Sequence, residues 1–136
     1  MSMDFRLEVV PVPVTDVDRA KRFYSEQAGF VVDLDTRIGD EMRLVQLTPP
    51  GSVCSIHLST EILGMPPGVL EGLQLVVPDI EVARAQLVDR GVEASSVQHM
   101  DDGVWVEGRG GDWNSFVFFS DPDGNSWVLQ ELPARD

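Results

Sequence analysis

The sequence contains a single cysteine, Cys54, two histidines and no long apolar run. One cysteine cannot form an intrachain disulfide, so a disulfide-stapled scaffold is excluded and a reducing, cytoplasmic location is expected. No stretch approaches the roughly 18 apolar residues of a membrane span, and no apolar leader follows Met1. Neither membrane association nor secretion is therefore expected.

Basic residues are also few: 10 stand against 23 acidic residues, which gives a formal net charge of −13. A field of this sign repels phosphate backbones and anionic lipid surfaces, so nucleic acid and membrane are not expected partners. Apolar residues make up 43% of the 136 residues, an ordinary globular composition. A chain of this length is expected to form one domain, residues 1–136.

The chain is organised as two similar halves. Asp16 and Asp79 each precede a helical apolar pattern and are suited to cap it. Aligning these two aspartates places Val14 on Val77 and Val17 on Ile80, among other matches. We interpret this as a tandem duplication, with module 1 at about 4–60, a linker at about 61–70 and module 2 at about 71–133.

Strands are expected on both sides of each helix. The valine-rich, alternating and aromatic patterns predict strands at 6–14, 30–36, 42–48, 53–59, 72–77, 92–98, 113–119 and 126–132. Residues 99–112 are rich in glycine and acidic residues, which predicts a loop or a loose hairpin and makes this segment a possible lid. Glu107 and Arg109 would then meet a ligand.

Two segments carry a family resemblance. They read VTDVDRAKRFYSEQAGF (Val14 to Phe30) and FFSDPDGN (Phe118 to Asn125). In this order, with a second capped helix between them, they resemble the vicinal oxygen chelate superfamily, which includes glyoxalase I, the bleomycin resistance proteins and the extradiol dioxygenases. The resemblance implies an α+β fold, in which two tandem βαβββ modules form a curved mixed sheet around a cleft, and a homodimer.

Metal-dependent members of this superfamily hold one divalent ion with side chains from four strand positions. The resemblance places these positions at Val9, His57, Gly72 and Val128. Only His57 offers a donor atom, and zinc or iron needs three or four protein ligands. Metal-dependent glyoxalase I or extradiol dioxygenase activity is therefore not expected, and no cofactor is predicted. A site built from His57, His99 and Glu107 would require the glycine-rich segment to fold into the cleft.

The resemblance also implies that the concave sheet faces line the cleft. Strand alternation then gives Ser55, His57, Gln74 and Gln130 as ligand-binding residues, with Arg43 or Gln46 from the neighbouring strand. Trp113, Phe116 and Phe118 could stack on a planar ligand, although such a stripe is more often core, and we favour core for at least two of the three. The predicted ligand-binding set is Arg43, Gln46, Ser55, His57, Gln74, Trp113 and Gln130.

These observations favour a metal-free protein that binds a small organic ligand, as the bleomycin resistance branch does by capture. Its acidic charge is compatible with a cationic guest. The alternative is a lyase or isomerase of the glyoxalase group that uses His57 as a general base, with no metal or with a non-standard metal site. A protein that acts only through its dimer or a partner is the third hypothesis.

Overall fold

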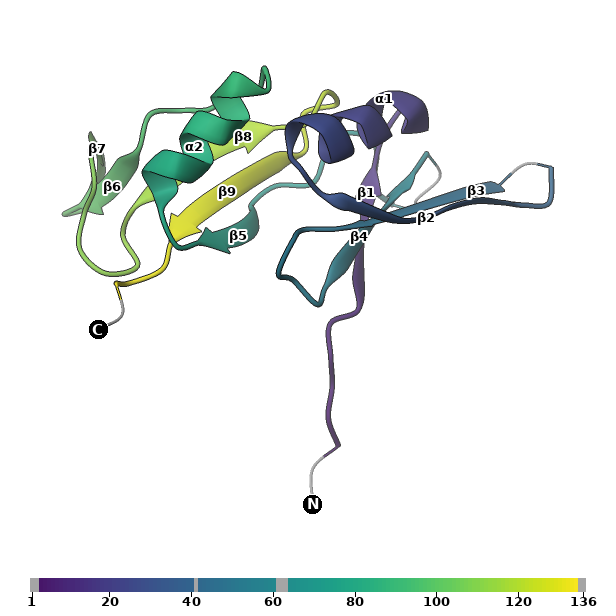
Figure 1. Ribbon diagram of the computed structural model, residues 1–136, viewed down its shortest axis with the longest axis horizontal. Coiled ribbons are helices and arrows are strands. Elements are labelled where there is room, and N and C mark those ends of the chain that lie inside the picture. Colours follow the sequence, from purple (N-terminus) through teal and green to yellow (C-terminus); the bar gives the residue numbers. More distant parts are fainter. Residues whose placement is uncertain (1–2, 41, 61–63, 135–136) are drawn as a thin grey trace.

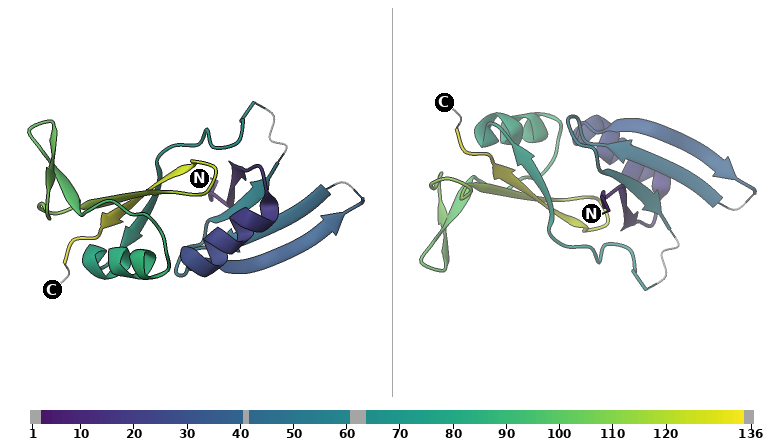
Figure 2. Two further views of the ribbon diagram at one scale, coloured as in Figure 1. Left: turned by 90° about the horizontal axis from the view of Figure 1, so that it is seen from above. Right: turned by 90° about the horizontal axis from the view of Figure 1, so that it is seen from below.

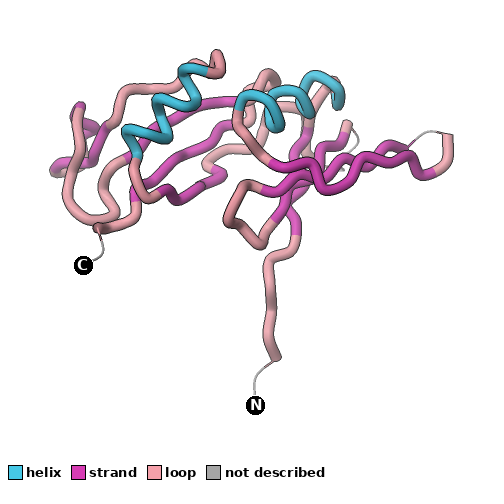
Figure 3. Tube along the Cα trace, in the orientation of Figure 1, coloured by secondary structure: helices cyan, strands magenta, loops and turns pink. Residues whose placement is uncertain are grey.

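The computed structural model describes residues 3–40, 42–60 and 64–134. The first half contains β1 (Val9–Pro13), α1 (Val17–Arg22), the π-helical turn η1 (Phe23–Gln27), β2 (Val31–Ile38), β3 (Met42–Thr48) and β4 (Ser55–Ser59). The second half contains β5 (Leu73–Val77), α2 (Ile80–Asp89), β6 (Gln98–Asp101), β7 (Val104–Glu107), β8 (Phe116–Ser120) and β9 (Ser126–Glu131). Strands make up most of the regular structure (Figure 3). Part of the predicted linker, residues 61–63, lies outside the described residues.

The strands form two mixed sheets, one from each half. The first has the order β1-β4-β3-β2 and the second β5-β9-β8-β6-β7. β1 pairs in parallel with β4, and β5 pairs in parallel with β9. The other strand pairs are antiparallel. Both helices lie on one side of the sheets (Figure 1), and the two halves lie side by side (Figure 2). This arrangement confirms the predicted α+β fold of two tandem modules. We call the side away from α1 and α2 the helix-free face.

The helices begin and end where the sequence indicates. The Asp16 side chain accepts a hydrogen bond from the Arg19 amide at 3.1 Å, and Asp79 accepts bonds from the first-turn amides of α2. Such bonds satisfy amides that have no partner within the helix. Gly29 follows the first helix with a φ of 80° and Gly91 the second with 87°, a conformation that suits glycine.

The segment after α2 differs from the prediction. Residues 92–97 are not a strand, and the expected loop contains the β6–β7 hairpin instead. Ser95 explains part of this difference, because its amide donates to the Phe118 carbonyl while its hydroxyl accepts from the Phe118 amide. This side-chain bond replaces the regular ladder. Trp113 precedes β8 with a φ of 62°, outside the strand predicted to contain it.

The two modules share one hydrophobic core between the sheets and the helices. Tyr24 and Trp127, one from each half, are buried there, with their ring centroids 5.7 Å apart. The Tyr24 hydroxyl donates to Asp121 at 2.7 Å and accepts from the Trp127 indole at 2.9 Å. The core therefore contains a fully paired polar contact that joins the modules.

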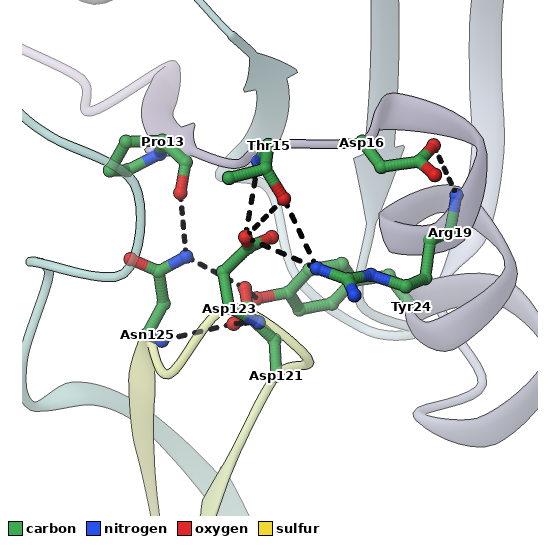
Figure 4. Close-up of polar contacts among 8 residues, drawn as sticks. All are labelled: Pro13, Thr15, Asp16, Arg19, Tyr24, Asp121, Asp123 and Asn125. Atoms are coloured by element: carbon green, nitrogen blue, oxygen red, sulfur yellow. Dashed lines mark hydrogen bonds and ion pairs between the residues drawn. The ribbon is translucent and has the colours of Figure 1, made fainter.

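The turn at 121–125 connects the two halves (Figure 4). The buried Asn125 amide donates to the Pro13 carbonyl and to Asp121, both at 2.8 Å. Asp123 accepts bonds from the Thr15 amide and hydroxyl and from Arg19. The segment that the sequence indicates as a tight turn is thus also the polar contact that holds module 2 against the end of β1.

An N-terminal arm, residues 3–8, extends away from the body on the helix-free side (Figure 1). Only its end is paired, because the Glu8 carbonyl accepts from the Ser55 amide at 2.9 Å. Met3, Phe5 and Leu7 alternate with charged residues and are 76%, 93% and 70% exposed. The arm therefore presents an apolar edge that the rest of the chain does not cover.

Candidate functional site

In the first sheet, polar side chains lie on the helix-free face because the apolar residues that alternate with them face the core. His57 pairs with Gln46 across β4 and β3, next to the buried pair Leu58 and Val45. Ser55 lies on the same side, where its hydroxyl is 2.6 Å from that of Thr48. The predicted residues Gln46, Ser55 and His57 are thus brought together on one surface.

Arg43 lies on the opposite face of β3. It shares the strand side of Val45 and forms ion pairs with Asp18 of α1 and Asp35 of β2, at 2.6 and 2.9 Å. Hydrogen bonds from Arg43 and from Lys21 hold the pKa of the Asp35 carboxyl well below its usual range. Of the two alternatives from β3, Gln46 faces the helix-free side, and Arg43 ties α1 to the sheet.

His57 is half-buried, at the centre of the polar surface. Within the described ranges no carboxylate hydrogen-bonds its imidazole, so those residues do not supply the orienting acid that would help a general base. Gln46, directly opposite, is the neighbour that strand pairing places nearest. This arrangement suits hydrogen bonding to a ligand.

In the second sheet, a chain of amides crosses the helix-free face. Gln74 of β5 donates to Gln130 of β9 at 2.6 Å, and Gln130 donates to the Trp113 carbonyl at 2.8 Å. Trp113 is half-exposed beside them. The structure therefore brings together the three ligand-binding residues predicted in module 2, while those from module 1 lie on the other sheet.

An aromatic cluster lies next to these amides. Trp105 of β7 meets Phe116 and Phe118 of β8 edge to face, with ring centroids 5.5 and 5.1 Å apart. Phe116 pairs with Gln130 across the sheet, which places the rings on the helix-free face. The sequence analysis missed Trp105, although alternation within Val104–Glu107 could have indicated a strand. Our preference for core was wrong for Phe116 and Phe118, because Val117 and Phe119 fill the core side of β8.

A hollow of about 400 Å³ adjoins Phe118 of this cluster, at the end of β8 and the start of β9. Phe118 and Val128 line it from the helix-free side. Glu107 also faces this side, because it pairs with Gln98 in register with Trp105 and Met100. Arg109 instead bonds Glu131, which caps α2 at the Ile80 amide. The 99–112 segment is therefore anchored to the body at Arg109.

The residues of the superfamily metal positions do not fit a metal ion. Val9, Gly72 and Val128 have no donor atom in their side chains, which leaves His57 alone. Among residues 3–40, 42–60 and 64–134, no group of three or more histidine, cysteine or acidic side chains is placed to hold an ion. His99 instead bonds the Gly108 carbonyl at 2.8 Å.

The described helices are too short and polar for any of them to span a membrane.

The family model of the Glyoxalase/Bleomycin resistance protein/Dioxygenase superfamily matches residues 6–129. Among curated proteins, YetH of Bacillus subtilis (strain 168) is 24% identical over 128 residues, covering 93% of this chain and 98% of YetH. The match thus extends through both modules.

Solved structures also match nearly the whole length of this chain. TnmS3, an antibiotic binding protein from Streptomyces sp. CB03234, is 32% identical with a TM-score of 0.80, over 98% of this chain and 100% of TnmS3. A superfamily member from Sphaerobacter thermophilus DSM 20745 is 29% identical with a TM-score of 0.76, over 96% of this chain and 99% of its own. Both structural matches thus extend through the two modules of this chain.

Proposed function

Because the chain belongs to the glyoxalase/bleomycin resistance protein/dioxygenase superfamily, we propose that it is a metal-free member that sequesters or senses a small organic ligand. The observation that carries this proposal is the aromatic cluster beside the Gln74–Gln130 amides, in which Trp105 is exposed and Phe116 and Phe118 are half-buried. The similarity to TnmS3, an antibiotic binding protein, supports a binding role.

The chemistry of this surface favours a planar aromatic ligand. Ring faces and edges attract flat apolar molecules, and Trp105 is still 46% exposed, so its surface is available. Gln74 and Gln130 retain further amide donors and acceptors after bonding each other. Glu107 adds a carboxylate on the same face. A flat molecule with a polar or cationic substituent satisfies all three features.

We also propose that a second copy of the chain closes the binding surface. Leu34, Ile38 and Met42 are exposed large hydrophobic residues on the helix-free side of the first sheet. Apolar surface of this kind usually marks a contact with another molecule. The arm, residues 3–8, extends on the same side (Figure 1). A homodimer would cover both features and bring the polar surface around His57 toward the aromatic cluster of the partner.

The second candidate is an enzyme of the glyoxalase group that uses His57. Its support is the half-buried imidazole opposite Gln46, on the face that would meet the ligand. The variant His57→Ala separates the two functions. Unchanged ligand affinity with loss of turnover would assign catalysis to His57. Stoichiometric divalent metal in the purified protein would contradict the metal-free proposal.

A titration with proflavine, a planar aromatic cation, tests the binding proposal. We expect it to quench tryptophan fluorescence and raise the melting temperature of the wild-type protein. Trp105→Ala should weaken binding about tenfold, because one ring contact contributes about 1 kcal/mol or more.

Val104→Ala is the matched control, since Val104 is exposed on the other side of β7. It should bind proflavine as the wild type does. Absence of proflavine binding by the wild type, together with absence of binding by neutral planar aromatics, would contradict the proposal. Equal binding by wild type and Trp105→Ala would remove the aromatic cluster from the site.

A further inference from the structure

A second cavity, of about 150 Å³, lies at the seam between the two modules. Its apolar walls come from both halves and include Ala28, Phe30, Pro49, Leu75, Ala83 and Leu87. Leu75 and Val77 belong to the side of β5 that packs on the core. Val76, which also lines the cavity, shares the side of Gln74, but neither the Gln74–Gln130 amides nor the aromatic cluster lines it. The cavity is therefore separate from the surface assigned above. The cavity opens to solvent and Gln86 and Arg90 add polar atoms to its lining, while its volume suits a ligand of the size of benzene.

Arg90 is the one charged residue among the described residues that line this cavity. Its Nη1 atom lies 2.7 Å from the point where a Cβ of Gly29 would stand, so the guanidinium packs directly on the Gly29 backbone. Gly29 stands between Ala28 and Phe30, two residues of the cavity wall. The backbone of Arg90 is held as well, because its carbonyl accepts from Gln27 at 3.1 Å. Arg90 is itself exposed, so its guanidinium is accessible beside the cavity.

No carboxylate of the described residues pairs with Arg90. Ion pairs are formed instead by Arg19, Lys21, Arg43 and Arg109. Among the described residues, the cavity is lined by one cation and by no acid, although the chain has 23 acidic and 10 basic residues. A guanidinium presents a planar fork of donors that matches a carboxylate in a bidentate manner.

We propose that this seam cavity binds a small monocarboxylate with a compact apolar body, such as an arene carboxylate. The ring enters between Ala28 and Ala83 and the carboxylate meets Arg90. Because the walls come from both modules, the ligand bridges them and stabilises their contact. The net charge of −13 opposes anion binding, so the local guanidinium must supply the attraction. A dissociation constant of about 1 mM or lower is expected for a ligand of this size.

Three benzene derivatives of similar size test the charge preference: benzoate, benzamide and benzylammonium, each competed against 4-fluorobenzoate by fluorine NMR. The wild type should bind benzoate at least tenfold more tightly than benzamide, and benzylammonium most weakly. Arg90→Gln should reduce benzoate affinity to that of benzamide. Arg22→Gln is the matched control, since Arg22 is an exposed arginine of the other helix outside the cavity. It should bind all three probes as the wild type does.

A filling variant tests the location. Ala83→Leu should abolish binding of every probe, whereas Trp105→Ala should leave it intact even if the proposed ligand surface fails its own test. If Ala83→Leu does not fold, amide chemical shifts of the wild type give the location, and benzoate should shift Ala28, Val77, Ala83 and Leu87. Equal affinity for the three probes, shifts confined to other residues, or an Arg90→Gln variant that binds benzoate normally would overturn the proposal.

Discussion

At the scale of single residues, ion pairs between basic and acidic side chains hold the first helix against the first sheet. Arg43 reaches Asp18 on α1 and Asp35 on β2, and Lys21 reaches Asp35 from the helix. These contacts lower the pKa of Asp35 and of Asp18, since Arg43 bonds each carboxylate in its charged form. A network of several charges in good geometry contributes more than an isolated surface pair.

Asp35→Asn tests this network. A carboxyl whose pKa is lower in the folded than in the unfolded chain stabilises the fold above the unfolded pKa, about 3.9. That contribution is lost as the pH falls through the folded pKa. The variant should therefore be less stable than the wild type by about 0.5–1 kcal/mol at pH 7, and the difference should disappear in acid.

Urea unfolding at a series of pH values measures this difference. Asp33→Asn is a less suitable comparison because Asp33 bonds Thr48, so Asp112→Asn, on an exposed loop, is the control. The loss begins below about pH 4 and continues down to the lowered pKa of Asp35, so a difference that stays constant from pH 7 to pH 2 would contradict the assignment to Asp35. High salt should reduce the difference, since exposed charges are screened.

At the scale of elements, the turn at 121–125 does more than reverse the chain. Asn125 donates to Pro13 of β1 and accepts from the Leu70 amide, so one buried side chain holds β1, the segment before β5 and the β8–β9 turn together. Tyr24 adds the contact with Asp121 from the first helical segment. The two modules share a core because these polar contacts fix its edge.

Asn125→Ala should destabilise the protein by about 2–4 kcal/mol. The change removes the bonds that Asn125 donates to the Pro13 carbonyl and to Asp121, and it leaves the Leu70 amide without its partner. The Pro13 carbonyl keeps its bond from the Gly68 amide. A lost hydrogen bond costs about 0.5–1.5 kcal/mol and an unpaired buried group about 1–3 kcal/mol. Chemical denaturation followed by tryptophan fluorescence measures the loss. Asp112→Ala, on the exposed loop, should change stability by no more than about 0.5 kcal/mol. Equal stability of Asn125→Ala and wild type would show that the turn does not hold the modules.

At the scale of the whole molecule, exposed apolar side chains concentrate on the helix-free side and on the arm. Removing a side chain of the size of Phe5 or Leu7 from water contributes about 1.5–3 kcal/mol. We therefore expect the arm to take part in the proposed dimer, because burying its exposed apolar side chains would stabilise the contact. Within the described part of its own chain the arm is paired only at Glu8.

The double variant Phe5→Ser, Leu7→Ser should weaken the dimer at least tenfold. Sedimentation velocity over a range of micromolar concentrations measures the dissociation constant. Val82→Ser is the control, because Val82 is 52% exposed on α2, on the opposite side of the sheets from the arm (Figure 1). A wild-type protein that is monomeric at these concentrations would refute the dimer. A double variant that dimerises like the wild type would place the interface elsewhere.

The sequence by itself determined the local features. Asp16 and Asp79 start the helices, alternation separates the faces of β4, and valine or glycine occupies three superfamily metal positions whatever the packing. These features depend on neighbours in the chain or on side-chain chemistry, so they can be predicted without knowing the tertiary contacts.

Only the tertiary structure decided which strand faces are covered. A period of two gives two faces but does not say which one meets the helices, so Arg43 and Gln46 stayed equivalent until the pairing of β3 with β4 was known. Phe116 and Phe118 face away from the core because Val117 and Phe119 fill it. Trp105 joins them through a hairpin that pairs with β8 at a single position. Contacts between residues distant in the chain carry this information, and a single sequence does not reveal them.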